Sequence, residues 1–190
     1  MARGEARAGV RDLTDALERA SGADGQCVGR SDPLRGGKFS TWDGGSRVPF
    51  IIWGPGRIPA GVVSDEIVSS MDIFPSFATL AEIPLKPEHT RGPIDGHDLS
   101  DFFLGKTKTT TRDEIMFYTN QGYLQGFRKG DYKIRTHGGP QLYAITKDPG
   151  ETNNLYKESP EHIERFKTMH ARMKEIEADW KTNSRDRGRL

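Results

Sequence analysis

The chain has 190 residues, enough for one domain or slightly more with a hydrophobic core. It carries 28 Lys and Arg against 27 Asp and Glu, and the resulting net charge of +1 provides no field that would attract nucleic acid or an acidic membrane surface. Its single cysteine, Cys27, excludes an internal disulfide framework and a cysteine-rich zinc site.

Residues 1–30 contain a predicted helix and no apolar run long enough for the core of a signal peptide. From Ala6 to Ala20, apolar residues recur at helical spacing, and Ser21-Gly22 ends the pattern. No segment of the sequence has the length and apolar content of a membrane span, so none is expected.

The segment from Leu34 to Phe50, LRGGKFSTWDGGSRVPF, places Lys38 behind two glycines and just ahead of an apolar run. Lys38 does not fit a nucleotide-binding P-loop, because Phe39 occupies the position that requires Ser or Thr. Taken alone, the glycine pair indicates a surface turn. The apolar run from Val48 to Trp53 predicts a buried strand, which Gly54-Pro55-Gly56 would end.

Two helices are predicted next. The first begins at about Asp72, which can cap it, with Pro75 tolerated in the first turn. The second is short, follows the residues Asp95 to Leu99, and ends near Gly105.

Beyond the linker at Lys106 to Thr111, the period changes to that of strands. We expect four short antiparallel strands, at residues 115–118, 123–128, 131–136 and 141–145. The second and third would be joined by a turn at Lys129-Gly130.

A final helix is predicted from Pro160, with Ser159 as its cap. Apolar residues at spacings of three and four predict a stripe that packs in the core. The stripe consists of Ile163, Phe166, Met169, Met173, Ile176 and Trp180. Residues 181–190 are polar and are expected to form a disordered tail.

Two separate motifs resemble those of the sulfatase family. The lysine segment meets every fixed position of the pattern L-R-x-x-K-x-x-x-[WY]-[ED]-G-G-x-R-V-P, and the strings GFRKGDYKI and LYAITKDPGETNNL resemble the family's C-terminal subdomain. The resemblance runs from about Ser31 to Trp180. It implies an α/β fold, in which the C-terminal part of an alkaline-phosphatase-like domain (1–105) precedes a small α+β subdomain (106–180). This subdomain would be a four-stranded antiparallel sheet packed by a C-terminal helix.

The resemblance also implies roles for individual residues. Lys38 is expected to contact the sulfate group, because its ammonium offers three donors to the sulfate oxygens as charge builds up. The preceding glycines would let the backbone approach the anion. Asp43 and Arg47 are expected to be a structural pair that fixes the loop. Asp32 is a candidate metal ligand, with a turn aspartate as the alternative, since one carboxylate alone does not hold Ca²⁺ or Mg²⁺.

The complete family enzymes use Ca²⁺ or Mg²⁺ and a formylglycine made from the cysteine of Cys-x-Pro-x-Arg. Cys27 stands in Cys-Val-Gly-Arg and does not match, and the five histidines show no zinc-type spacing. We therefore expect the C-terminal portion of a sulfatase that binds neither cofactor and is inactive alone. The complete enzyme would hydrolyse a sulfate ester of a small molecule or a sulfated sugar.

Other interpretations remain beside this one. A non-catalytic anion-binding protein, or a relic, would also keep Lys38 after losing the nucleophile. A related phosphatase or phosphonate hydrolase is disfavoured by both motifs. No nucleic-acid partner is expected. Self-association is expected, because sheet edges and apolar surface would be exposed. Family members are often exported, periplasmic or lysosomal, but the absence of a signal-peptide core in this chain leaves the compartment open.

Overall fold

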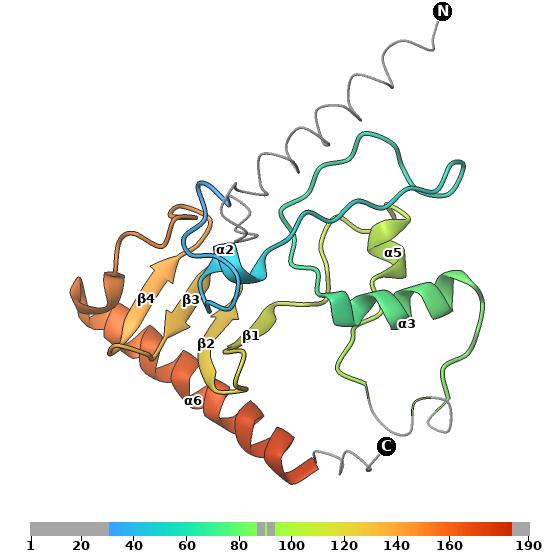
Figure 1. Cartoon of the computed structure of the whole chain (residues 1–190). Helices are drawn as coiled ribbons and strands as arrows, with labels where there is room; N and C mark the ends of the chain where they lie inside the picture. The colour runs from blue at the N-terminus through green and yellow to red at the C-terminus, as the bar shows by residue number, and fades with distance from the viewer. Residues whose placement is uncertain (1–30, 87–89, 91–93, 184–190) are drawn as a thin grey trace, which may run out of the picture. The chain divides into compact units, whose positions relative to one another are not determined.

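The computed structural model in Figure 1 describes residues 31–86, 90 and 94–183. The predicted helix at Ala6–Ala20 and Cys27 lie outside the described residues. Internal contacts group the chain into two compact units, and each is described by itself. Of the described residues, the first unit holds 31–48, 116–127 and 131–183, and the second holds those within 49–115 together with 128–130. The expected boundary at residue 105, between the alkaline-phosphatase-like part and the small C-terminal subdomain, stays a prediction.

Four strands form one antiparallel sheet in the order β1-β2-β3-β4. They span Glu114–Tyr118, Leu124–Lys129, Tyr132–Arg135 and Gln141–Ala144. Each strand end lies within one residue of its predicted position, and the predicted sheet is confirmed. Gly130 adopts a φ of 54° at the predicted turn between β2 and β3, a conformation that glycine enters at little cost.

The sheet has one apolar face and one polar face. Ile134 on β3 is paired with Leu142 on β4, and Lys133 is paired with Tyr143. Because successive side chains of a strand point to opposite faces, Ile134 and Leu142 share one face and Lys133 and Tyr143 share the other. The Ile134 face packs on the C-terminal helix in a core that also contains Phe127 of β2.

The C-terminal helix, α6, spans Pro160–Asn183 and begins where the sequence predicts. Ser159 caps it by accepting a hydrogen bond from the His162 N–H at 3.2 Å. Before it, the single-turn helix η1 spans Leu155–Lys157. The core prediction holds for the middle of the stripe, where Phe166, Met169 and Met173 are buried. Of the helices described, none has the length and apolar composition needed to cross a membrane.

The core prediction is wrong for Trp180, which is 50% exposed. The reason is geometric. A helix of 24 residues is about 36 Å long, whereas β3 and β4 have four residues each and cover about 13 Å. The last turns of α6 therefore extend past the strands on which its middle packs.

The second unit contains helices α3, Ser70–Leu80, and α5, Ser100–Phe103. The expectation that Asp72 caps α3 is wrong, because Ser69 is the cap and Asp72 is the third helical residue of a capping box. Pro75 therefore lies inside the helix and not in its first turn. The short helix before Gly105 is confirmed as α5.

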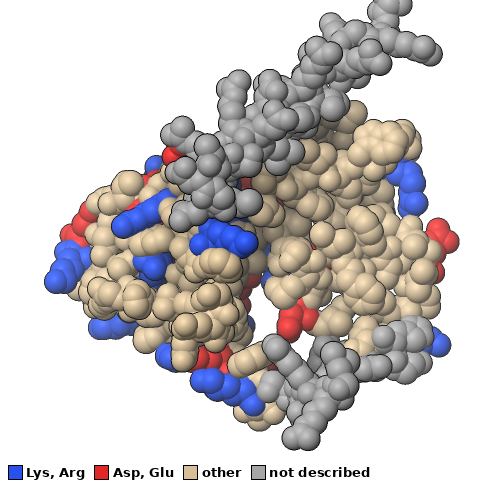
Figure 2. Space-filling view, in the orientation of Figure 1, with Lys and Arg blue, Asp and Glu red and all other residues tan. Residues whose placement is uncertain are grey.

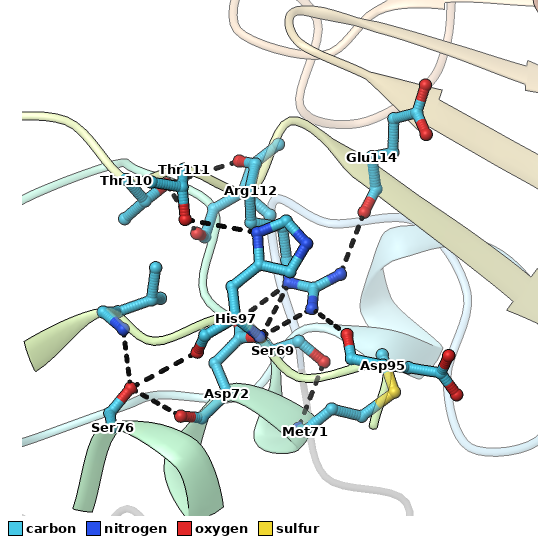
Figure 3. Close-up of polar contacts among 12 residues, drawn as sticks. Ser69, Met71, Asp72, Ser76, Asp95, His97, Thr110, Thr111, Arg112 and Glu114 are labelled. Carbon is cyan, nitrogen blue, oxygen red and sulfur yellow. Dashed lines mark hydrogen bonds and ion pairs between the residues drawn. The ribbon is translucent and has the colours of Figure 1, made fainter. Parts of the chain in front are cut away.

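Asp72 and Arg112 form a buried ion pair in the second unit (Figure 3). Arg112 Nε donates to both Asp72 oxygens at 2.9 and 2.8 Å, and Nη2 donates to Asp72 Oδ1 at 2.6 Å. The backbone N–H groups of Ser69 and His97 complete the shell of donors at 2.8 Å each. Arg112 Nη2 also donates to the carbonyl of Asp95 at 2.7 Å. The pair thus ties the start of α3 to the segments before α5 and β1.

We expect the stability of the second unit to fall in acid through Asp72. Burial raises the pKa of Asp72, but hydrogen bonds from Arg112, His97 and Ser69 lower it by more, so the folded-state pKa lies below the ordinary value. Such a group stabilises the fold above its unfolded pKa of about 3.9, and this contribution is lost as pH falls through the folded pKa. Urea unfolding at a series of pH values between 6 and 2.5 measures the effect. Asp72→Asn should flatten the profile, and an unchanged profile in that variant would contradict the assignment.

The predicted buried strand at Val48–Trp53 is wrong. These residues form no strand, and Ile51 and Trp53 are 79% and 83% exposed. A strand apolar on both faces needs neighbouring strands and covering helices, and the four described strands pair only with one another. Over α3 and α5 the visible surface carries few charged side chains, in keeping with this exposed apolar run (Figures 1 and 2).

Candidate functional site

Lys38 lies at the tip of a short loop in the first unit, residues 34–47, here called the Lys38 loop. Gly44 N–H donates to Arg35 O at 2.8 Å and closes the loop, while Ser40 N–H donates to Gly37 O at 3.0 Å and forms the turn that carries Lys38. The turn expected at the glycine pair lies slightly later in the chain, from Gly37 to Ser40 with Lys38 and Phe39 at its centre. The loop ends in a single-turn helix, α2, Asp43–Ser46, which the sequence did not predict.

The Lys38 side chain is exposed, and its ammonium makes no hydrogen bond or ion pair with any described residue. Its Nζ lies 5.0 Å from the centre of the Phe39 ring. Phe39 has a φ of 71°, a left-handed conformation that bulky residues seldom adopt, and this bend forms the tip of the loop. The ammonium is thus open to an external anion.

Three buried charged side chains, the Asp43–Lys133–Glu151 cluster, hold the base of the loop. Lys133 Nζ donates to Asp43 Oδ1 at 2.7 Å and lies 2.9 Å from Glu151 Oε1. The Asp43 N–H donates to Glu151 Oε2 at 2.7 Å, so each member contacts the other two. All three are at most 1% exposed. The expected Asp43–Arg47 pair exists at 3.8 Å, but Lys133 is the closer partner.

Trp42 holds the loop at a second point. The guanidinium carbons of Arg35 and Arg135 lie 3.9 and 3.4 Å from the centre of its ring. Tyr143 meets the ring edge-on at 5.8 Å between centres. Arg135 also donates to Thr41 Oγ1 from Nη2 at 3.1 Å. Cation–π and hydrogen-bond contacts therefore join the residues just before Asp43 to β3 and β4.

Three glycines, Gly36, Gly44 and Gly45, are required by the packing of the loop itself. Gly36 has a φ of 77°, and a Cβ there would lie 2.8 Å from the Trp42 Cβ. A Cβ at Gly45 would collide with the Gly37 carbonyl oxygen. These glycines allow the two ends of the loop to pass close together, and the idea that the glycine pair before Lys38 approaches an anion stays a prediction.

Glu151 reaches the cluster from a turn with an unusual backbone. Its φ is 49°, and its N–H donates to the Asp148 carbonyl at 3.0 Å. The Asp148 carboxylate accepts hydrogen bonds from the Thr152 and Asn153 N–H groups, both at 2.8 Å. Burial raises the pKa of Asp148, but these hydrogen bonds lower the pKa by more than burial raises it. The pKa of Asp148 therefore lies below its ordinary value. The ionised Asp148 thus fixes the turn that directs Glu151 inward.

Burial also shifts the pKa of two side chains beside Trp42. It lowers the pKa of Arg135, an effect that attraction to Glu151 opposes. It raises the pKa of Tyr143, whose neutral phenol donates to Gln141 Oε1 at 3.1 Å. Since a guanidinium stays protonated in proteins, Arg135 remains a fixed cation at the base of the loop.

Asp32, the candidate metal ligand, is exposed and lies on the chain just before the loop. Within the part of the chain that the structure describes, no group of three or more His, Cys, Asp or Glu side chains is placed to hold a metal ion. The described residues therefore do not fit a Ca²⁺ or Mg²⁺ site, which needs six or more oxygen ligands. Of the histidines, His89 lies outside the described residues, and His97 contacts Thr111 Oγ1 at 3.2 Å.

The sequence proposes Lys38 as the contact residue and names Asp43 among the residues that fix the loop, but it does not indicate Lys133 or Glu151. Lys133 and Glu151 are separated from Asp43 by 90 and 108 residues, so no local pattern joins them. One signal was available for Lys133. Lys133 lies between Tyr132 and Ile134 in β3, so its side chain points to the opposite face of the strand from theirs. Both faces of this strand are packed, and a lysine is rare at such a position unless it has an ion-pair partner.

Comparison with known proteins gives the site its context. The family model described as Sulfatase matches residues 15–83, which include the whole Lys38 loop. Arylsulfatase G of Rattus norvegicus is 33% identical over 150 residues, covering 67% of this chain and 28% of the rat protein. Human arylsulfatase A is 36% identical over 155 residues, with 67% and 29% coverage. Human steryl-sulfatase is 32% identical over 182 residues, with 76% and 30% coverage.

Solved structures agree in fold. A structure from Bacteroides thetaiotaomicron, described under the metabolism of multiple glycosaminoglycans, has a TM-score of 0.64 at 26% identity, covering 86% of this chain and 35% of the other. The PsFucS1 sulfatase of Pseudoalteromonas sp. has a TM-score of 0.66 at 23% identity, covering 81% and 34%.

The fold is therefore α/β and of the alkaline-phosphatase-like class, as the sequence predicts. Both sets of comparisons then agree on one group within that class. The chain belongs to the sulfatase family. It spans less than a third of the length of the curated relatives described above.

Proposed function

We propose that this chain provides the sulfate-contacting lysine and the small C-terminal subdomain of a sulfatase, an enzyme that hydrolyses sulfuric esters. The observation that carries the proposal is the exposed Lys38 ammonium, which makes no hydrogen bond or ion pair with any described residue and stands on a loop held by buried ion pairs. Membership of the sulfatase family supports ester hydrolysis by the complete protein.

Lys38 has the chemistry that the role requires. A sulfate monoester carries a negative charge on its non-bridging oxygens, and an ammonium can donate to several of them. As the ester bond breaks, further charge develops, and a donor already in place stabilises it without reorganising. A lysine held in an ion pair would first have to leave its partner. The matched relatives are named arylsulfatase and steryl-sulfatase, so an aryl or steroid sulfate is the proposed substrate class.

The complete reaction needs groups that the described residues do not supply. Sulfatases generally use a formylglycine nucleophile and Ca²⁺, and neither the described residues nor the sequence around Cys27 fits these groups. No step of the reaction is therefore assigned to them. We propose that the 190-residue chain alone binds sulfate esters weakly and does not hydrolyse them.

Lys38→Ala is expected to weaken the binding of phenyl sulfate to the 190-residue chain at least tenfold. Removing a charge-assisted hydrogen bond costs about 1.5–3 kcal/mol, and about 1.4 kcal/mol is tenfold in affinity. Titration followed by amide chemical shifts measures dissociation constants in the millimolar range. Lys147→Ala is the matched control, since Lys147 is an exposed lysine of the same unit. Equal affinity of the wild type and Lys38→Ala would overturn the proposed contact.

A non-catalytic anion-binding protein is the second candidate. It is favoured by one observation, namely that the Lys38 loop is fully anchored within the described residues although no metal cluster lies among them. The same titration separates the two. Millimolar, Lys38-dependent binding supports part of an enzyme, whereas a dissociation constant of about 10 µM or less, near −7 kcal/mol, supports a dedicated binding protein.

A further inference from the structure

We propose that Lys133 is a positioning residue for Lys38, acting through Asp43 and Glu151. The inference rests on the proposed function of Lys38. Lys133 does not reach the tip of the loop, because its Nζ is buried and engaged by two carboxylates and by the Phe117 ring, 3.9 Å from the ring centre. Any effect on anion binding must therefore pass through the loop.

The cluster lies next to the bond that closes the loop. Asp43 immediately precedes Gly44, whose N–H donates to Arg35 O. Arg35 in turn donates from Nη1 to the backbone carbonyl of Glu151 at 2.9 Å. Both ends of the loop thus meet the turn that carries Glu151, and Asp43 also contacts Lys133. Releasing Asp43 from Lys133 removes the anchor beside the closing bond, and Lys38 loses its fixed place.

The charges explain why one ammonium is decisive. Two buried carboxylates, of Asp43 and Glu151, face a single Lys133 ammonium. Of the neighbouring cations, Arg47 is 3.8 Å from Asp43 Oδ2 and 46% exposed, while Arg35 and Arg135 are engaged with Trp42. Without Lys133, the two carboxylates would remain together with only the half-exposed Arg47, 3.8 Å from Asp43, as an ion-pair partner, and a buried charge that loses its close partner is strongly unfavourable. The loop that carries Asp43 is the part free to move away.

The backbone of Glu151 supports the same role. A buried non-glycine residue with a positive φ persists only where its surroundings force that conformation, and such residues gather at functional sites. Here the strained residue directs its carboxylate at the Asp43 N–H and at Lys133.

A double-mutant cycle in the 190-residue chain tests the proposal. Lys133→Met is expected to weaken phenyl sulfate binding at least tenfold, and Lys38→Ala with Lys133→Met should bind no more weakly than Lys38→Ala alone. A residue with a general structural role would weaken binding further in the double variant. Lys174→Met is the matched control, because it removes an exposed ion pair of the same unit, and wild-type affinity is expected. Additive losses, or wild-type affinity in Lys133→Met, would overturn the positioning role.

Amide hydrogen exchange provides a second readout that does not depend on binding. In Lys133→Met the loop amides of Ser40, Gly44 and Gly45 should exchange at least tenfold faster, while those of Thr136 and Ile145, bonded just beyond the ends of β3 and β4, stay as in the wild type. Unchanged loop exchange would also overturn the proposal. If Lys133→Met does not fold, the triple variant Asp43→Asn, Lys133→Met, Glu151→Gln leaves no charge in the Asp43–Lys133–Glu151 cluster and is measured in the same way.

The outcomes separate the two proposals. Phenyl sulfate binding that is unaffected by Lys38→Ala refutes the proposed function and with it the positioning of Lys38 for an anion. Binding that is lost in Lys38→Ala but kept in Lys133→Met refutes the positioning role alone. Loss in both, without additivity and with faster loop exchange, supports both.

Discussion

Arg112→Met is expected to destabilise the second unit by about 3–5 kcal/mol, the usual cost of leaving one member of a buried ion pair without its partner. Asp72 is fully buried and receives three of its five hydrogen bonds from Arg112. Methionine keeps much of the volume but none of the donors. The loss also frees the Asp95 carbonyl, so two contacts of the segment before α5 weaken together, that of Asp95 with Arg112 and that of His97 with Asp72.

Urea unfolding, followed by hydrogen exchange of the α3 amides, measures this loss. Lys106→Met is the control, since its ion pair with Asp101 is as short, 2.8 Å, but more than 60% exposed on each side, and should matter by less than about 1 kcal/mol. Asp72→Asn with Arg112→Met should recover part of the loss, because no buried charge then remains. A loss in Arg112→Met no greater than that in Lys106→Met would show that the pair does not hold this unit.

Phe127→Ala is expected to destabilise the first unit by a similar amount, about 3–5 kcal/mol. Phe127 is fully buried on β2, in the core that joins the sheet to α6. It shares this core with Ile134, Leu142, Phe166, Met169 and Met173. Truncation leaves a cavity that paired strands cannot close, because their spacing is fixed by the backbone hydrogen bonds.

Thermal unfolding, read from the circular dichroism of α6, measures the effect of Phe127→Ala. Phe39→Ala serves as the control, since it removes the same ring from the same unit at a position that is 65% exposed. The control should shift the midpoint by a small fraction of the core variant's shift. Equal shifts would mean that Phe127 is not central to the core.

The sequence predicted the elements whose signals are local. Strand alternation placed all four strands, and the Ser159 and Pro160 pair placed the start of α6. It failed where two local signals compete or where a distant partner decides. Ser69 and Asp72 can each cap a helix, and only the reciprocal bonds of the capping box settle the order. For Val48–Trp53 the sequence indicates apolar character but not whether neighbouring strands exist to pair with it.

In the candidate site, too, some features follow from local sequence and others depend on contacts between distant residues. Lys38 follows from a contiguous motif, and its exposure at a turn follows from the glycines beside it. The cluster that holds the loop depends on contacts across 90 and 108 residues, which only the fold brings together. Asp32 is a candidate by resemblance alone, and the described part of the chain places no group of three or more His, Cys, Asp or Glu side chains that could hold a metal ion.

The set of residue ranges that make up the first unit also indicates where insertions and deletions would leave the Lys38 loop unchanged. Residues 31–48 group by contacts with the strands and α6, and not with the residues 49–115 that follow them in sequence. Insertions or deletions between residues 49 and 115 therefore fall outside the set of side chains that anchor Lys38. Relatives can therefore differ in that stretch and keep the same set of side chains around the base of the Lys38 loop. A chain shortened at residue 83, where the family match ends, would instead keep Lys38 and lose both Lys133 and Glu151.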